Sequence, residues 1–238
     1  MLWADPLSHF DTLDFSAVLC LVAFWYCIGW IIENPPRNRP SVSKLMVFYR
    51  REWLLQFVER NTRVFDAQIL GNLRQGTAFF ASATMIAIGG GMALIGNTER
   101  LAGVADDLSL DKDPAFVWEI KLVVVLIFVA NAFLKFVWAH RLFGYCSVIM
   151  SAVPNDPDHS LARPRAHKAA EINVTAARSF NRAMRSVYFG LAATAWLAGA
   201  IPLILASSLT LLVLWRREFA SHSRSVLIEA TDSTPPAA

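Results

Sequence analysis

Two lysines and an asparagine interrupt an apolar stretch, where their positions suggest chemistry inside a membrane. Lys121, Asn131 and Lys135 lie between residues 116 and 140. On a helix that turns 100° per residue they fall within about 80° of one another, so they share one face. Charge within a bilayer is costly and often marks an ion path. Lysine stems that reach the interface, or an ion pair with Glu119, Glu33 or Asp66, explain the pattern better, because both lysines lie near the ends of the stretch. We expect Asn131 to form an interhelical hydrogen bond.

A second set of polar residues comes just before two apolar stretches. Asn72 and Asn181 each precede an aromatic pair by seven residues, which places each amide on the helical face of the first aromatic residue. An unpaired buried amide costs about 1–3 kcal/mol. We therefore predict that both asparagines join charged neighbours in one polar network, the alternative being two independent interfacial caps. The predicted members are Asp66, Asn72, Arg74, Arg178, Asn181 and Arg185, with Arg182 close enough to join them.

The sequence shows no pattern of catalytic, cofactor-binding or metal-ligating residues. It contains no HExxH, GxSxG, Walker or Rossmann glycine motif. Its three cysteines form no CxxC pair. His140 is the only histidine at an apolar stretch, so a haem held between two histidines is excluded. We predict no catalytic residue, no cofactor and no metal.

The elements that must position these residues are long apolar segments. The chain has 238 residues, of which 55% are hydrophobic and only 17% are charged. A helix that crosses a bilayer needs about 20 mostly apolar residues, and the chain has four such stretches. We predict spans at about 15–32, 76–95, 116–140 and 187–215. Pro202 is expected to kink the last span, which is unusually long.

The distribution of positive charge predicts how the chain is threaded, since Lys and Arg favour cytoplasmic loops. Eight of the 22 Lys and Arg residues lie between the first two spans, and seven lie between the last two. Only two lie between the second and third spans, and the net charge of +3 is too small to indicate nucleic acid as a partner. We predict a protein of the bacterial inner (plasma) membrane with both termini outside. Arg216 and Arg217, directly after the last span, oppose this arrangement.

The two long connections have helical patterns of their own. Apolar residues such as Leu45, Trp53 and Phe57 recur at helical spacing, and arginines fill much of the opposite face. We predict cytoplasmic amphipathic helices at about 41–74 and 165–186, suited to anionic lipid headgroups. The alternative, compatible with the first, is that these helices pack on each other. Residues 1–218 then form a single membrane domain, and 219–238 form a disordered tail.

Several segments resemble the membrane proteins grouped as domain of unknown function 599. They are Tyr49-Arg50-Arg51-x-Trp53, Asp66-Ala67-Gln68-Ile69-Leu70-Gly71-Asn72-Leu73, Phe79-Phe80-Ala81-Ser82-x-Thr84, Trp118-Glu119-x-Lys121, Lys135-Phe136-x-Trp138 and Ala176-Ala177-Arg178-x-Phe180-Asn181. The resemblance covers about residues 15–217. It implies a small multi-span membrane protein and carries no assigned activity or catalytic residue.

The sequence therefore predicts an all-α, polytopic membrane protein with four transmembrane helices and cytoplasmic amphipathic extensions. The leading hypothesis is a non-enzymatic scaffold or accessory subunit. The expected partners are anionic lipid headgroups and either a protein or a second copy of the chain. The alternatives are a small transporter or channel for an anion and, third, a membrane enzyme. The first two are distinguished by whether the polar face of residues 116–140 lines a cavity or packs against protein.

Overall fold

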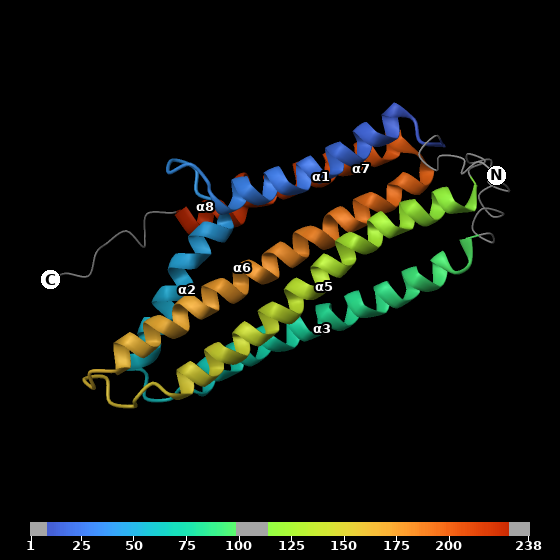
Figure 1. The fold of residues 1–238 in the computed structure, drawn as a ribbon. Helices are drawn as coiled ribbons and strands as arrows, with labels where there is room; N and C mark the ends of the chain where they lie inside the picture. Colours follow the sequence, from blue (N-terminus) through green and yellow to red (C-terminus); the bar gives the residue numbers. More distant parts are fainter. Residues whose placement is uncertain (1–8, 99–113, 229–238) are drawn as a thin grey trace.

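The computed structural model describes residues 9–98 and 114–228, and this part of the chain is helical without strands. Long helices run side by side along one direction (Figure 1). Their bounds are α1 Thr12–Glu33, α2 Val42–Glu59, α3 Val64–Ile95, α5 Ala115–Ser151, α6 Ala162–Thr194, the 3-10 turn η2 Ala195–Ala198, α7 Ala200–Phe219 and α8 His222–Ile228.

Three of these helices are much longer than a bilayer is thick. α3, α5 and α6 have 32, 37 and 33 residues, so α5 is about 55 Å long at 1.5 Å per residue. The hydrocarbon core measures only about 30 Å. One half of the bundle therefore extends beyond the bilayer. We call the half with α1 and α7 the membrane half, and the half with α2 the extramembrane half.

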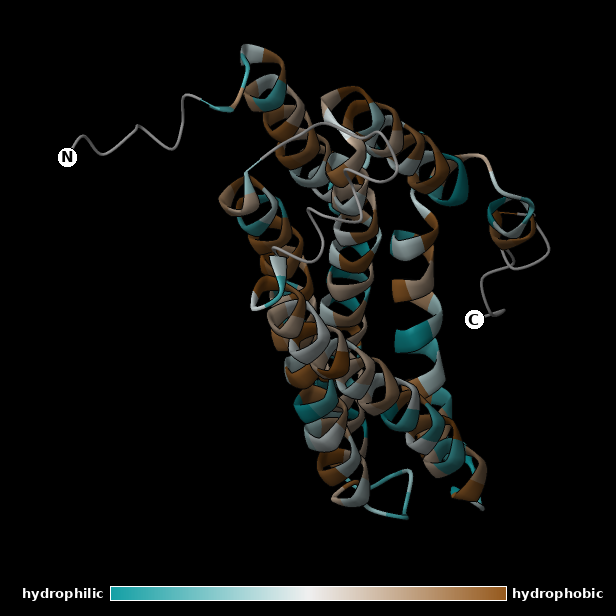
Figure 2. Ribbon diagram, turned by 90° about the vertical axis from the view of Figure 1, so that its right-hand side faces the viewer, coloured by the Kyte–Doolittle hydropathy of each residue, from teal (hydrophilic) through white to brown (hydrophobic). Residues whose placement is uncertain are grey.

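Within the described residues, four helices are long and apolar enough to cross a bilayer, and the membrane half contains their apolar parts. They are α1, α3, α5 and the α7–α8 segment. The core of the membrane half joins α1 to the end of α6 and to α7, with Leu21, Ile28, Phe189 and Leu203 almost fully buried. Large apolar side chains also cover the outside, as expected where lipid replaces water. Figure 2 shows hydrophobic residues along the outer surface of the helices as well as between them. The protein is thus an all-α membrane protein.

The extramembrane half has a separate hydrophobic core. Leu54 and Phe57 of α2, Phe143 and Cys146 of α5, and Ala166 of α6 are buried together there. The face of α6 toward this core is rich in alanine, which lets neighbouring helices approach closely. The two predicted amphipathic helices do pack on each other, with an ion pair between Arg51 and Glu171 at 2.6 Å. The pair also lowers the pKa of the Glu171 carboxyl.

The helix boundaries correct two predictions made from the sequence. The predicted helix at 41–74 is two helices, because the chain turns sharply at residues 60–63 between α2 and α3. The predicted tail at 219–238 is wrong in its first part, since α7 continues to Phe219 and α8 follows it. The remaining tail residues, 229–238, lie outside the described part.

The predicted span at 187–215 does not exist as one helix. α6 ends at Thr194, η2 follows, and α7 begins at Ala200 and runs back alongside α1 (Figure 1). Gly199 permits this reversal with φ +113° and ψ 172°, a conformation that is almost limited to glycine. Pro202 lies in the first turn of α7, where its missing N–H leaves no hydrogen bond unmade. It therefore helps to begin a helix and does not kink one.

The reversal places the two ends of the described chain at opposite ends of the bundle. The indole of Trp196 donates a 2.7 Å hydrogen bond to Asp14, at the start of α1. Glu218 instead lies next to Ser43, beyond the other end of α1. The described chain therefore begins and ends at opposite ends of the bundle.

We expect Gly199→Ala to destabilise the protein by about 1–3 kcal/mol, because any Cβ at this φ is strained. The change should lower the unfolding temperature in detergent, followed by tryptophan fluorescence. Gly90→Ala is the matched control: it lies inside α3, and its added Cβ meets no atom within 4 Å. Equal melting of the two variants would contradict the assigned role of Gly199.

Candidate functional site

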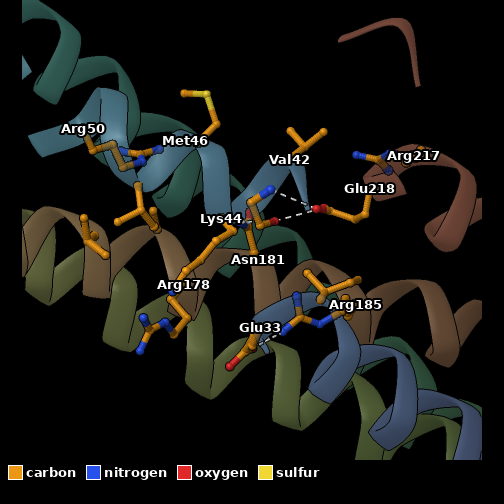
Figure 3. Close-up of a pocket in the computed structure, with 15 residues that line it drawn as sticks. Glu33, Val42, Lys44, Met46, Arg50, Arg178, Asn181, Arg185, Arg217 and Glu218 are labelled. Atoms are coloured by element: carbon orange, nitrogen blue, oxygen red, sulfur yellow. Dashed lines mark hydrogen bonds and ion pairs between the residues drawn. The ribbon is translucent and has the colours of Figure 1, made fainter. Parts of the chain in front are cut away.

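A cavity lies where the membrane and extramembrane halves meet. It has a volume of about 270 Å³ and is formed by the end of α1, the first turns of α2, the middle of α6 and the end of α7. Figure 3 shows Lys44, Arg178 and Asn181 around its centre, with Arg50 to one side and Arg217 to the other. We call it the junction cavity. Five of its lining side chains are cationic and two, Glu33 and Glu218, are acidic.

Glu33 is held by two arginines. Arg182 donates to both of its carboxylate oxygens, and Arg185 donates to one of them. The side chain of Arg185 is only 8% exposed, so this pair lies largely out of water. The contact joins the last residue of α1 to α6 and neutralises the Glu33 carboxylate.

Glu218 closes the cavity from the α7 side. Its two oxygens accept hydrogen bonds from the Ser43 backbone N–H at 2.9 Å and from the Ser43 hydroxyl at 3.0 Å. The acceptor thus lies at the N-terminus of α2, where backbone N–H groups lack helical partners. The Asn181 amide points to the same serine, with 3.5 Å between its Nδ2 and the Ser43 Oγ. These hydrogen bonds therefore connect α2, α6 and α7, which are distant in sequence.

Four cations of the cavity have no carboxylate partner. Among residues 9–98 and 114–228, Lys44, Arg50, Arg178 and Arg217 form no ion pair. Arg50 donates instead to the neutral Asn173 side chain at 2.6 Å, and Arg217 donates to the Tyr188 hydroxyl at 2.7 Å. Burial lowers the pKa of the Arg50 guanidinium. The cavity therefore has excess positive charge that the described residues do not balance.

The predicted single polar network is wrong, because its members separate by helix. Only Arg178, Asn181 and Arg185, with Arg182, come together, at the junction cavity. The members on α3 lie elsewhere. Asp66 is fully buried in the first turn of α3, where it accepts from Trp53 at 2.6 Å and from Arg60.

Asn72 and Arg74 do not reach the junction cavity. Asn72 is exposed on α3, and Arg74 faces α5, where its carbonyl lies 3.4 Å from His140. The rings of Phe80, Phe136 and Phe180 pack together where α3, α5 and α6 meet. Aromatic packing therefore takes the place of the predicted polar contact between α3 and α6.

The three polar residues of α5 share a face but form no shared site. Lys121 is 4% exposed and lies 5.4 Å from the Trp118 ring. It lines a cavity of about 520 Å³ with the first residues of α1. Lys135 lies 5.3 Å from the Trp25 ring, at a cavity that also includes Glu33. These cavities are at opposite ends of the membrane half.

Asn131 lies half-buried between the two lysines. No hydrogen bond to its side chain is found in the described part of the chain, so the predicted interhelical bond is absent. Of its helical neighbours, Phe128 is 5% exposed and packs edge-on against Trp25, whereas Ile127 and Leu134 are exposed. The polar face is therefore interrupted by packed protein at Phe128.

Sequence reasoning missed the contributions of α2 and α7 to the site. The sequence analysis did not assign Ser43, Lys44, Arg217 or Glu218 to the site. Residues 216–218 were expected on the side of the membrane opposite to Ser43 and Lys44. The one available signal was the conflict of Arg216 and Arg217 with the positive-inside rule. Contacts such as that between Ser43 and Glu218, which lie 175 residues apart, have no signature in local spacing.

The fold and this site define a helical membrane protein with a cationic cavity where its two halves join. The model of the family described as "Protein of unknown function, DUF599" matches residues 16–223. The chain belongs to this family, which confirms the resemblance seen in its motifs. No curated protein and no solved structure matches the chain.

Replacing Glu33 should show how much the junction depends on it. Glu33→Gln leaves Arg185 buried without its counter-charge, and we expect a loss of about 2–4 kcal/mol of unfolding free energy. Thermal unfolding in detergent measures the effect. Glu59→Gln is the control, because its pair with Arg163 is exposed on both sides and such pairs contribute about 0–1 kcal/mol. A Glu33 variant as stable as this control would contradict the assignment.

Proposed function

We propose that the protein is a non-enzymatic membrane scaffold, whose extramembrane half holds a protein partner against the membrane. The observation that carries this proposal is the packing of the α5 polar face. Lys121 and Lys135 line separate cavities, and Phe128, which lies between them on the same face of α5, is buried. An anion path would need a continuous polar lining, so the packing favours a scaffold over a channel.

The extramembrane half also supports this proposal. It has its own hydrophobic core and is braced by ion pairs between α2 and α6. It nevertheless leaves large apolar side chains in the open, with Val64, Phe65 and Val148 about 67–75% exposed. Apolar side chains beyond the bilayer are suited to contact with another protein. Among the described residues, no group of His, Cys, Asp and Glu is placed to hold a metal.

We further propose that the extramembrane half lies in the cytoplasm of a bacterial cell, beneath the plasma membrane. With α7 running back beside α1, the residues after it join the side of the two long connections. Eighteen of the 22 Lys and Arg residues then belong to that side, and two belong to the connection between α3 and α5. Arg216 and Arg217 no longer oppose the positive-inside rule but follow it. The N-terminus is outside, and α8 is inside.

Reporter fusions test this orientation. Green fluorescent protein fused after residue 238 should fluoresce, because it folds in the cytoplasm, and alkaline phosphatase fused there should be inactive. The same phosphatase placed before residue 1 should be active. Active phosphatase at both ends would contradict this orientation and support the arrangement with both termini outside.

Site-specific photo-crosslinking tests the scaffold. A benzophenone amino acid at Val148, in the extramembrane half, should give one discrete protein adduct in native membranes. At Leu134, which is 66% exposed within the membrane half, the same probe should give mainly lipid adducts. Anion flux through liposomes containing the purified protein, without any protein adduct at position 148, would favour the channel instead.

A further inference from the structure

A second cavity adjoins the junction cavity on its membrane side. It has a volume of about 290 Å³ and shares Ile32, Asn181, Arg185, Arg217 and Glu218 with the first. Its other lining residues are apolar or aromatic. They are Phe80 of α3, Phe180, Met184 and Tyr188 of α6, and Leu214 of α7.

The two cavities follow one another along α6, which runs from the extramembrane half into the membrane half. The residues of α6 that line the junction cavity lie between Val174 and Arg185, and those of the second cavity lie between Phe180 and Tyr188. The second cavity is thus displaced along α6 toward its membrane end. A cationic space at the interface continues into an apolar space at the depth of the acyl chains.

The charged side chains define what the first cavity would accept. Glu33 is already neutralised by two arginines, and Glu218 is engaged by Ser43. Lys44 and Arg178 are exposed at the mouth, whereas Arg50 lies deeper and is hydrogen-bonded only to a neutral amide. A guanidinium group binds phosphate oxygens in a paired geometry, and charge-assisted bonds of this kind are strong.

We propose that the two cavities together form a binding site for one phospholipid with an anionic headgroup. Its phosphate lies among Lys44, Arg50 and Arg178, and the start of one acyl chain lies beside Phe180 and Met184. This site gives the proposed scaffold a specific lipid partner and rests on its orientation, since the cavity must lie at the inner leaflet. A free phosphate ion would satisfy the cations but would leave the apolar cavity unused.

Native mass spectrometry of the full chain in a mild detergent tests the site. Dioleoyl phosphatidylglycerol is added to delipidated protein, and the affinity of the first bound lipid is measured. The double variant Lys44→Gln/Arg178→Gln should lower this affinity by about tenfold or more, since each cation near an anionic headgroup strengthens the binding. Both residues are exposed and unpaired in the described part of the chain, so the variant should melt as the wild type does.

The double variant Arg39→Gln/Lys168→Gln is the matched control. It removes the same charge from exposed positions outside both cavities and should change the affinity less than twofold. Equal weakening by the two double variants would overturn the site and leave only diffuse attraction to anionic surfaces. The absence of a tightly bound first lipid would overturn it as well.

Two further probes distinguish the source of the phosphate. Dioleoyl phosphatidylcholine, whose headgroup has no net charge, should bind much more weakly than phosphatidylglycerol. Inorganic phosphate at millimolar concentration should displace little of the bound lipid. Displacement by phosphate at the same affinity as the lipid would show that the acyl chain contributes nothing, which contradicts the lipid assignment. None of these outcomes depends on the protein adduct at Val148, so the scaffold and the lipid site can fail separately.

Discussion

The thickness of the bilayer determines the form of this molecule. A hydrocarbon core of about 30 Å accommodates about 20 helical residues, yet α5 has 37 and α6 has 33. Both helices continue beyond the interface as regular helices. There, α2 and the first turns of α3 cover their apolar faces. The extramembrane half is thus an extension of membrane helices and not an attached domain.

Because of this construction, charged side chains of several helices meet at the interface between the halves. Glu33 ends α1 at this level, and α6 supplies Arg182 and Arg185 to meet it. α7 returns to the same level and places Glu218 against the first turn of α2. The remaining cations cannot be satisfied by these two carboxylates. The same geometry that joins the halves therefore leaves a cationic cavity, and its surplus charge follows from how the helices are joined.

Much of the fold can be predicted from the sequence, because apolar length is a local property. The stretches at 15–32 and 76–95 carry no charge, and the stretch at 116–140 stays strongly apolar despite its charged residues. Proline and arginine mark the elements between these stretches. The reversal between α6 and α7 was missed for a physical reason: the turn contains Ala195, Trp196 and Leu197, which are as apolar as the helices around it. Polarity marks a turn in water, but a turn at the edge of a membrane half need not be polar. Only Gly199, with Pro202 three residues later, indicated the turn, and Pro202 was interpreted as a kink.

The candidate site was predictable only in part. The α6 residues Arg178, Asn181 and Arg185 were identified, since their helix could be recognised and their charges faced an interface. Their partners could not be identified, because side chains such as Ser43 and Glu218 meet through tertiary packing across 175 residues. Asn72 was grouped with Asn181 on similarity of spacing alone. Similar spacing before an aromatic pair places each asparagine on its own helix but says nothing of which helices become neighbours.

The pairing of α1 with α7 also sets the order in which the protein can be completed during synthesis. The ribosome makes α1 well before α7, and the inward residues Leu21 and Ile28 of α1 are covered by a core that includes Leu203 of α7. At about 5–20 residues per second, roughly ten seconds or more separate these two segments in translation. For that interval α1 has lipid or the insertion machinery where its final partner will lie. A helix that is made before its partner is therefore among the last to reach its native neighbours.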